Sequence, residues 1–273
     1  MINSAIADII GSAYEGRELK GFNLPFLTRK SEFTDDTVLM VATADLLMKT
    51  REKGIPLINL TSDDFARHYK LWGNRYPNVH YSPQFKGWLE SDSMEPIYSL
   101  GSGVTSRAFP IAWVADSLEE AMEVTARSAG STHAAPEANV AACAISYTIY
   151  LLLQGDHLDE IKNIIESKFF IPMTYNWEEL HKADSFSTNA EDVAGLGLAI
   201  GTTARSHEDG MRLVLYVGGD TDTIGAVAMA VLDARFPGGG FSEIEGACRE
   251  MIGDNDGDRL IDVIDRFDAA YMQ

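Results

Sequence analysis

The sequence predicts an all-α protein that folds as a single compact globular domain of many helices. Apolar residues recur at helical spacing through most of the chain, with charged residues between them. Long stretches that alternate between apolar and polar residues, as half-buried strands do, are missing from the sequence. No internal repeat or linker divides the 273 residues, so we expect one domain over residues 1–273.

Each predicted helix follows from its own pattern. Residues 37–52 are apolar on most of the helix circumference and become charged at the end, whereas residues 117–128 carry one apolar stripe. The uncharged stretch 138–155 is shorter than the roughly 20 apolar residues that cross a membrane, so we expect a central buried helix there. Helical periodicity also predicts helices at residues 156–169, 190–203, 207–216, 223–235, 242–252 and 258–271.

Residues 68–112 have a different composition, rich in Gly, Pro, Ser and aromatic residues. We expect a long segment without regular structure here. Loops of this length are usually functional or disordered, and the aromatic content argues against disorder. The segment is therefore expected to contribute to a functional site.

Composition and charge limit the classes of function. Hydrophobic residues make up 45% of the chain, and the net charge is −19. A charge of this sign repels phosphates, so neither nucleic acid nor an anionic membrane surface is expected as a partner. Most of the carboxylates are expected on a solvated surface, although the charge also suits a protein that gathers cations.

The compartment is expected to be the cytoplasm. Cys143 and Cys248 fall in apolar helical stretches, which favours buried free thiols in a reducing compartment over a disulfide or a metal site. Residues 1–16 lack a basic segment and contain Asp8 and Glu15, so no signal peptide is expected.

Two clusters of Thr and Asp stand at the start of predicted helices. They read FTDDTVLM at residues 33–40 and GGDTDTIG at residues 218–225. Any one of these side chains alone is typical of a helix cap. Only one side chain can cap each helix, however, and adjacent carboxylates repel each other unless a proton or a cation lies between them.

Together the two clusters offer four carboxylates and several hydroxyls, which are the hard oxygen donors that select Mg²⁺ or Mn²⁺ over zinc. The oxygens suffice for two ions, and such a pair can orient a substrate and activate water. Helix N-termini repel cations, but four negative charges outweigh two partial charges, and the same N-termini attract phosphate. We therefore expect a binuclear metal site at helix N-termini.

Two further loops offer substrate contacts. Gly101 and Gly103, in GSGVTSRAFP, would let the backbone approach a ligand and offer N–H groups to a diphosphate, although Gly-Ser-Gly is also common in ordinary loops. His133, in STHAAPE, could donate to a substrate phosphate or hydroxyl, or be a hydrogen-bonded loop histidine. The acidic segment 254–265 departs from the calcium-loop pattern at Arg259 and Asp265, and is expected to be a solvated turn.

The order of these motifs resembles the ADP-ribosylglycohydrolase family, including its dinitrogenase-reductase-activating and ADP-ribosylserine hydrolase types. The resemblance covers most of the chain. ADIIGSAYEG at residues 7–16 is similar to the opening helix and turn of the family, and FTDDTVL and VGGDTDTIGAV are similar to its two metal motifs. YSLGSGVTSRAFPIAW resembles its glycine-asparagine-glycine substrate loop, and STHAAPEA its Thr-His element.

This resemblance implies an all-helical fold with two Mg²⁺ or Mn²⁺ ions per chain and an ADP-ribosyl substrate whose ribose hydroxyls lie at the metals. The implied metal ligands are Thr34, Asp35, Asp36, Asp220, Asp222 and Thr223. The implied contacts to the diphosphate and ribose are Gly101, Ser102, Gly103 and His133. The carboxylates expected to move protons are Asp35, Asp36 and Glu15.

Three residues depart from the family pattern. Ser102 stands where the substrate loop usually has asparagine, Leu100 where an aromatic often precedes that loop, and Ala135 where many bacterial members have a second histidine. These changes bear on affinity and on the leaving group. The six metal-type residues are complete, which argues against a catalytically inactive relative.

The sequence thus predicts a hydrolase that releases ADP-ribose from a modified protein side chain. The acceptor could be arginine or serine, or the substrate could be a small conjugate such as O-acetyl-ADP-ribose. A second class of function is a non-catalytic protein that binds ADP-ribose or neutralises a toxin on the same fold. A purely structural role is disfavoured, because no structural need explains six metal-type ligands.

Overall fold

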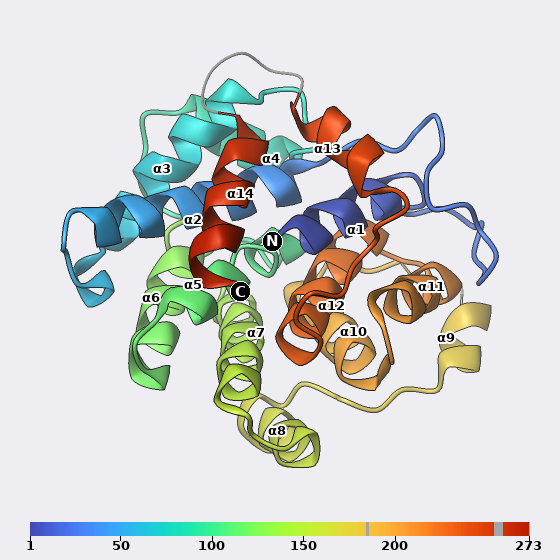
Figure 1. The fold of residues 1–273 in the computed structure, drawn as a ribbon. Coiled ribbons are helices and arrows are strands. Elements are labelled where there is room, and N and C mark those ends of the chain that lie inside the picture. The colour runs from blue at the N-terminus through green and yellow to red at the C-terminus, as the bar shows by residue number, and fades with distance from the viewer. Residues whose placement is uncertain (184–185, 254–258, 273) are drawn as a thin grey trace.

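The computed structural model describes residues 1–183, 186–253 and 259–272, and these form fourteen α-helices and no β-strand (Figure 1). The helices pack as one compact domain, which confirms the predicted all-α class. Residues 254–258, in the segment expected to be a solvated acidic turn, lie outside the described residues.

Helix α12, Thr221–Arg235, forms the centre of one half of the molecule and is buried along nearly its whole length. Its neighbours are α1 (Ile2–Ser12), α7 (Pro136–Gln154), α10 (Ala190–Thr203) and α11 (His207–Val217). A methyl group at Gly197 or Gly201 of α10 would overlap Val227 or Val231 of α12. The two glycines therefore permit the close packing of these helices.

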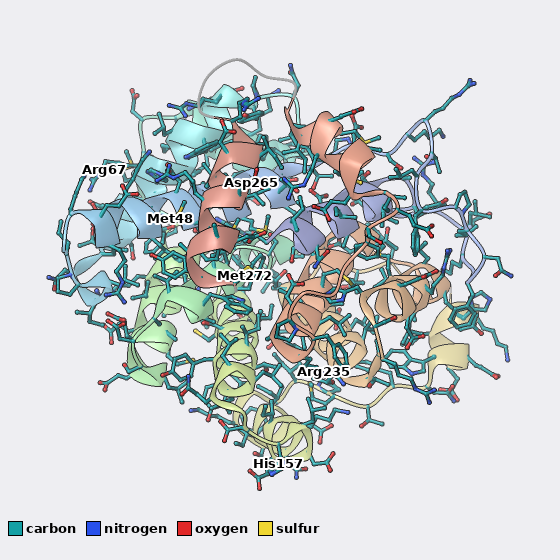
Figure 2. The ribbon with its side chains drawn as sticks, in the orientation of Figure 1. Met48, Arg67, His157, Arg235, Asp265 and Met272 are labelled. Atoms are coloured by element: carbon teal, nitrogen blue, oxygen red, sulfur yellow. The ribbon has the colours of Figure 1, made fainter. Side chains whose placement is uncertain are left out.

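Helix α2, Asp35–Glu52, forms the centre of the other half. It packs against α3 (Ser62–Arg75), α5 (Phe109–Val114) and α14 (Leu260–Tyr271), while α6 (Leu118–Gly130) covers α7. The remaining helices are α4 (Pro83–Glu90), α8 (Leu158–Ile164), α9 (Trp177–Lys182) and α13 (Glu245–Gly253). Side chains such as Arg67 and His157 extend outward at the periphery (Figure 2).

The helices expected from periodicity are present, with boundaries that shift by a few residues. The segment 156–169 forms α8 and then a π-helical turn, Ile165–Phe169. The uncharged stretch forms α7, which is the one helix among the described residues that is long and apolar enough to cross a membrane by length and composition. Half of the apolar stretch of this helix is buried inside the protein, where α7 packs against neighbouring helices. Both Cys143 and Cys248 are buried and free, as expected.

The expectation that residues 68–112 lack regular structure was wrong. Helix α3 continues to Arg75, α4 covers Pro83–Glu90, and a 3₁₀ turn follows at Ser102–Val104. Each α-helix is started by a local cap rather than by a long apolar stripe: Thr61 and Asp64 form a capping box, and Ser82 caps α4. The aromatic residues of the segment are largely core residues of these short helices, namely Tyr69, Trp72, Phe85 and Trp88.

A buried carboxylate joins α2 to α3. Asp45 Oδ2 lies 2.9 Å from His68 Nε2 and accepts hydrogen bonds from Trp72 Nε1 at 3.1 Å and from Lys49 Nζ at 2.7 Å. Burial alone would raise the pKa of Asp45, but the hydrogen bonds and charges of His68 and Lys49 outweigh it and lower the pKa to about 2. The ionised carboxylate therefore stabilises the fold.

We predict that Asp45→Asn lowers the free energy of unfolding at neutral pH by about 2 kcal/mol, the size of a shift of nearly two pKa units. Because the folded-state pKa is depressed, the contribution of Asp45 is present above the unfolded pKa near 4 and is lost as the pH falls toward 2. Urea unfolding of both proteins between pH 7 and pH 3 measures this difference.

The matched control is Asp63→Asn, which removes an exposed carboxylate of α3 whose nearest ion pair, to Arg67, spans 3.9 Å. An exposed pair contributes little, so the control should unfold like the natural protein. Equal losses in the two variants would show that Asp45 has no special role.

Candidate metal and substrate site

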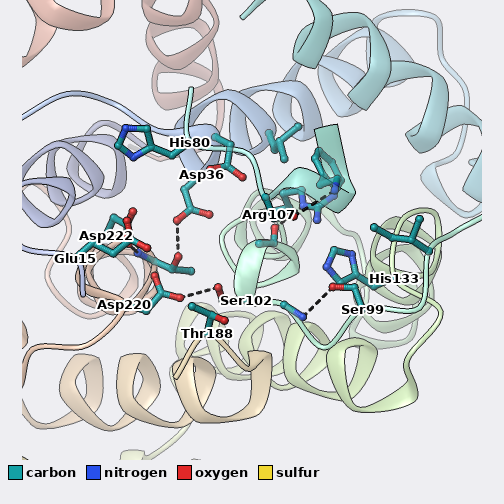
Figure 3. A pocket seen from close by; sticks show the side chains of 18 residues that line it. Glu15, Asp36, His80, Ser99, Ser102, Arg107, His133, Thr188, Asp220 and Asp222 are labelled. Atoms are coloured by element: carbon teal, nitrogen blue, oxygen red, sulfur yellow. Dashed lines mark hydrogen bonds between the residues drawn. The ribbon is translucent and has the colours of Figure 1, made fainter. Parts of the chain in front are cut away.

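Several chain segments meet around one cavity of about 280 Å³ (Figure 3). They include the turn after α1, the starts of α2, α4 and α12, the segment that contains the 3₁₀ turn at Ser102–Val104, and the residues His133 and Thr188. Every residue predicted for the site lines this cavity except Thr34. The predicted residues on its wall are Glu15, Asp35, Asp36, Gly101, Ser102, Gly103, His133, Asp220, Asp222 and Thr223.

Glycines place α12 against the end of α1. A Cβ atom at Gly11 would overlap the backbone of Thr221 and Asp222, and the Thr221 hydroxyl donates to the Gly11 carbonyl oxygen at 2.7 Å. Gly218 and Gly219, with φ of 77° and 95°, turn the chain into α12 through a backbone region that other residues rarely adopt. This contact brings Asp222 next to the turn that follows α1.

Asp8 is a site residue that the sequence interpretation missed. Its carboxylate accepts hydrogen bonds from the backbone N–H groups of Thr34 (2.9 Å) and Thr37 (3.2 Å), and from both hydroxyls. Asp8 on α1 therefore caps the start of α2. The Thr34 hydroxyl also accepts from the Asp36 N–H, so this expected metal ligand has its side chain engaged by protein groups. The sequence signal for Asp8 is an aspartate within the apolar run IADII.

The carboxylates divide into two kinds. Asp36 accepts hydrogen bonds from the hydroxyls of Ser106 and Thr223, both at 2.6 Å, and Asp220 accepts from Ser102 at 2.7 Å. These bonds hold their carboxylates in place. The side chains of Asp35 and Glu15 accept no hydrogen bond from another residue in the described part of the chain, although both line the cavity. Asp35 accepts only from its own backbone N–H.

Burial and mutual repulsion raise the pKa values of the acidic cluster. For Glu15, Asp35, Asp36 and Asp222, burial is the main cause of the raised pKa, and neighbouring carboxylates add to it. The pKa of Asp35 rises to about 7, and those of Asp36 and Asp222 lie well above the usual value for aspartate. A buried cluster of this kind requires protons or cations between its oxygens.

Two overlapping sets of three carboxylates could each hold a cation. In the first, Asp8, Asp36 and Asp222 each offer one oxygen, and all three oxygens lie within 4.8 Å of one another. In the second, Glu15, Asp220 and Asp222 do the same, so Asp222 belongs to both sets. The donors are all hard oxygens, which fit Mg²⁺ or Mn²⁺.

The other end of the cavity is built by the glycine loop and His133. The N–H group of Gly101, one of the two that sequence analysis offered to a diphosphate, already donates to Ser99 Oγ, and the N–H group of Ser102 donates to the Thr188 carbonyl oxygen. Ser102 also points its hydroxyl at Asp220 rather than at this end (Figure 3). Substrate contacts here therefore depend more on side chains than was expected from the sequence.

Arg107 is a second residue that sequence reasoning missed. It lines the cavity while only 1% exposed, and its Nε donates to the Gly103 carbonyl oxygen at 2.5 Å. Its guanidinium lies over the ring of Tyr69, 4.7 Å from the centroid. Its place four residues beyond Gly-Ser-Gly carried no signal by itself, because a lone arginine in a loop is usually exposed.

The fold and the cavity define a class: an all-α protein with hard-oxygen groups at facing helix N-termini that could hold divalent cations. The chain belongs to the ADP-ribosylglycohydrolase family, whose model matches residues 1–272. Membership supports hydrolase activity of the ADP-ribosylglycohydrolase type.

A solved structure described as an ADP-ribosylglycohydrolase-related protein complex has the same fold, with a TM-score of 0.66. The two chains share 19% sequence identity, and the similarity covers 92% of this chain and 93% of the other. A search of curated proteins found no match.

We predict that Asp222→Asn has opposite effects on stability without and with metal. In a chelator, the loss of one buried negative charge should raise the melting temperature, while the amide oxygen can still accept from the Thr223 N–H. In Mn²⁺ the natural protein should gain stability, by about 2.7 kcal/mol at 100 times the dissociation constant. The variant should gain far less.

Thermal unfolding in chelator and in MnCl₂ measures both effects. Asp156→Asn serves as the control, because this carboxylate is exposed and lies outside the site. If MnCl₂ stabilises Asp222→Asn as much as it stabilises the natural protein, Asp222 is not a metal ligand shared by the two carboxylate sets.

Proposed function

We propose that the protein hydrolyses the bond between the anomeric carbon of ADP-ribose and an atom of a modified protein side chain, with two Mg²⁺ or Mn²⁺ ions as cofactors. The observation that carries this proposal is the polarity of the cavity. One end gathers buried carboxylates, and the other holds Arg107 and His133. A substrate with a ribose diol at one end and a diphosphate beyond it matches that polarity.

The acidic end fits the ribose. Asp36, Asp220 and Asp222 would hold the cations, which when bound supply positive charge for the ribose hydroxyls and lower the pKa of a nearby water. Hydroxyls of the chain keep these carboxylates from turning away, since Thr223 and Ser102 donate to Asp36 and Asp220. The elements that carry the ligands are rigid helix ends, which favours a fixed geometry.

Asp35 and Glu15 are the carboxylates best placed to move protons, because neither is held by a hydrogen bond to another described side chain. One would accept a proton from water as the water oxygen bonds to the anomeric carbon, and the other would give a proton to the departing acceptor atom. The bond from carbon to acceptor breaks with its electron pair on the acceptor. Free ADP-ribose and the unmodified acceptor are the products.

An exposed apolar side chain near the acidic end supports a protein acceptor over a small conjugate. Phe186 is 52% exposed, and its ring would contact a side chain placed at Gly16, next to Glu15. A small leaving group such as acetate would not need such a surface.

We predict that Asp35→Asn lowers kcat for ADP-ribose release by at least about 100-fold, the lower range for a proton-transfer group. Stability should change little, since the amide oxygen can still accept the one hydrogen bond that the carboxylate accepts, from the backbone N–H of residue 35. Release of ADP-ribose from peptides modified on serine or on arginine, and from O-acetyl-ADP-ribose, is measured with Mg²⁺ present.

The control for this experiment is again Asp156→Asn, which should keep full activity. If only O-acetyl-ADP-ribose is hydrolysed, the substrate is a small conjugate and not a modified protein. Tight ADP-ribose binding by calorimetry without turnover of any substrate would instead make the protein a binder.

A further inference from the structure

Arg107 is a buried cation whose hydrogen bonds go to neutral oxygens. Within the described residues it makes no ion pair with a carboxylate at 4.0 Å or less. Besides its bond to Gly103, its Nη1 donates to the hydroxyl oxygen of Thr132 at 3.1 Å. Arginine has only donors, so Thr132 must accept this bond and its own proton must point elsewhere.

The Thr132 hydroxyl proton has two possible destinations. The first is His133 Nδ1 at 2.9 Å, and the second is the Ala129 carbonyl oxygen at 3.4 Å. That carbonyl already accepts from the backbone N–H groups of Thr132 (3.2 Å) and His133 (2.9 Å), which use its two lone pairs. The hydroxyl therefore donates to Nδ1.

This bond fixes the state of the imidazole. When Nδ1 accepts a hydrogen bond, a neutral ring carries its proton on Nε2. Burial, helped by the charge of Arg107, lowers the pKa of His133 to about 3, so the ring is neutral near pH 7. Nε2 has no hydrogen-bond partner in the described part of the chain, and His133 lines the cavity.

Gly101 lies beside Nε2 on the cavity wall. Even a Cβ atom at Gly101 would be in ordinary van der Waals contact with Nε2 of His133, at 3.6 Å. The N–H group of His133 is thus a donor on the wall of the cavity. The neighbouring guanidinium makes this end favourable for an anionic oxygen.

We propose that Arg107 and Thr132 are positioning residues that hold His133 in its Nε2–H form, so that it donates a hydrogen bond to a phosphate oxygen of the substrate. His133 then acts as a donor and not as a base. The identity of the substrate rests on the proposed function, whereas the position of the proton does not.

The test is ¹⁵N NMR of histidine-labelled protein at neutral pH, with the His133 signals assigned from a His133→Gln variant. The natural protein should show a protonated Nε2 and an unprotonated Nδ1. Thr132→Val removes the donor to Nδ1 and should populate the other tautomer, and Thr132→Ser should restore the first. A merely structural role for Thr132 would not reverse the tautomer in this way.

Binding of ADP-ribose by calorimetry gives a second measurement. Thr132→Val should weaken affinity by about 10- to 100-fold, the range for a hydrogen bond to a charged group, and Thr132→Ser should recover most of it. In the hydrolysis assay, Thr132→Val should change KM, which should rise, more than it changes kcat.

The outcomes separate the two proposals. A natural protein with the proton on Nδ1 overturns the inference, and the spectrum of the natural protein decides this even if Thr132→Val does not fold. Unchanged affinity in a folded Thr132→Val with the altered tautomer overturns the phosphate contact. An Nε2–H tautomer and normal ADP-ribose binding without hydrolysis of any conjugate would support the inference while removing the proposed function.

Discussion

Repulsion among buried carboxylates is the constraint on which the rest of the site depends. Asp36 and Asp222 are nearly inaccessible to solvent, and the pKa of each is raised first by burial and then by neighbouring carboxylates. Such a group is costly in a folded protein unless cations or protons balance it. This cost falls at the wall of the cavity, where hydroxyls from segments distant in the sequence hold the carboxylates in position. The arrangement could hold divalent cations.

The helix starts serve two purposes in this arrangement. Their N–H groups need acceptors, and Asp8 supplies one for α2 from the neighbouring helix. Because Asp8 of α1 accepts these N–H groups, the Asp35 side chain can face the cavity. Thr34 shares this capping role, because its hydroxyl accepts from the Asp36 N–H. The start of α2 is thus capped by Asp8 and Thr34 together, and the Asp35 carboxylate is not needed for capping.

The sequence predicted the helical class, most helices and the acidic residues on the cavity wall, because these depend on local patterns. It did not predict α3 and α4. The Gly, Pro, Ser and aromatic residues of the segment 68–112 were taken as signs of a loop, although the aromatic residues of α3 and α4 are buried on these helices. Asp8 and Arg107 were missed because their roles come from contacts with residues 26 and 25 positions away, at Thr34 and Thr132. Nothing local distinguishes a buried arginine that lines a cavity from an exposed loop arginine.

The bond from the Thr223 hydroxyl to Asp36 joins residues 187 positions apart. No shorter stretch of chain contains both halves of the acidic cluster, so a polypeptide emerging from the ribosome cannot assemble it until α12 has been made. Closing a loop of this length carries a large entropic penalty, and a cation that bridges the two halves would act as a reversible cross-link. Metal content would then influence how firmly the first and last quarters of the chain are held together.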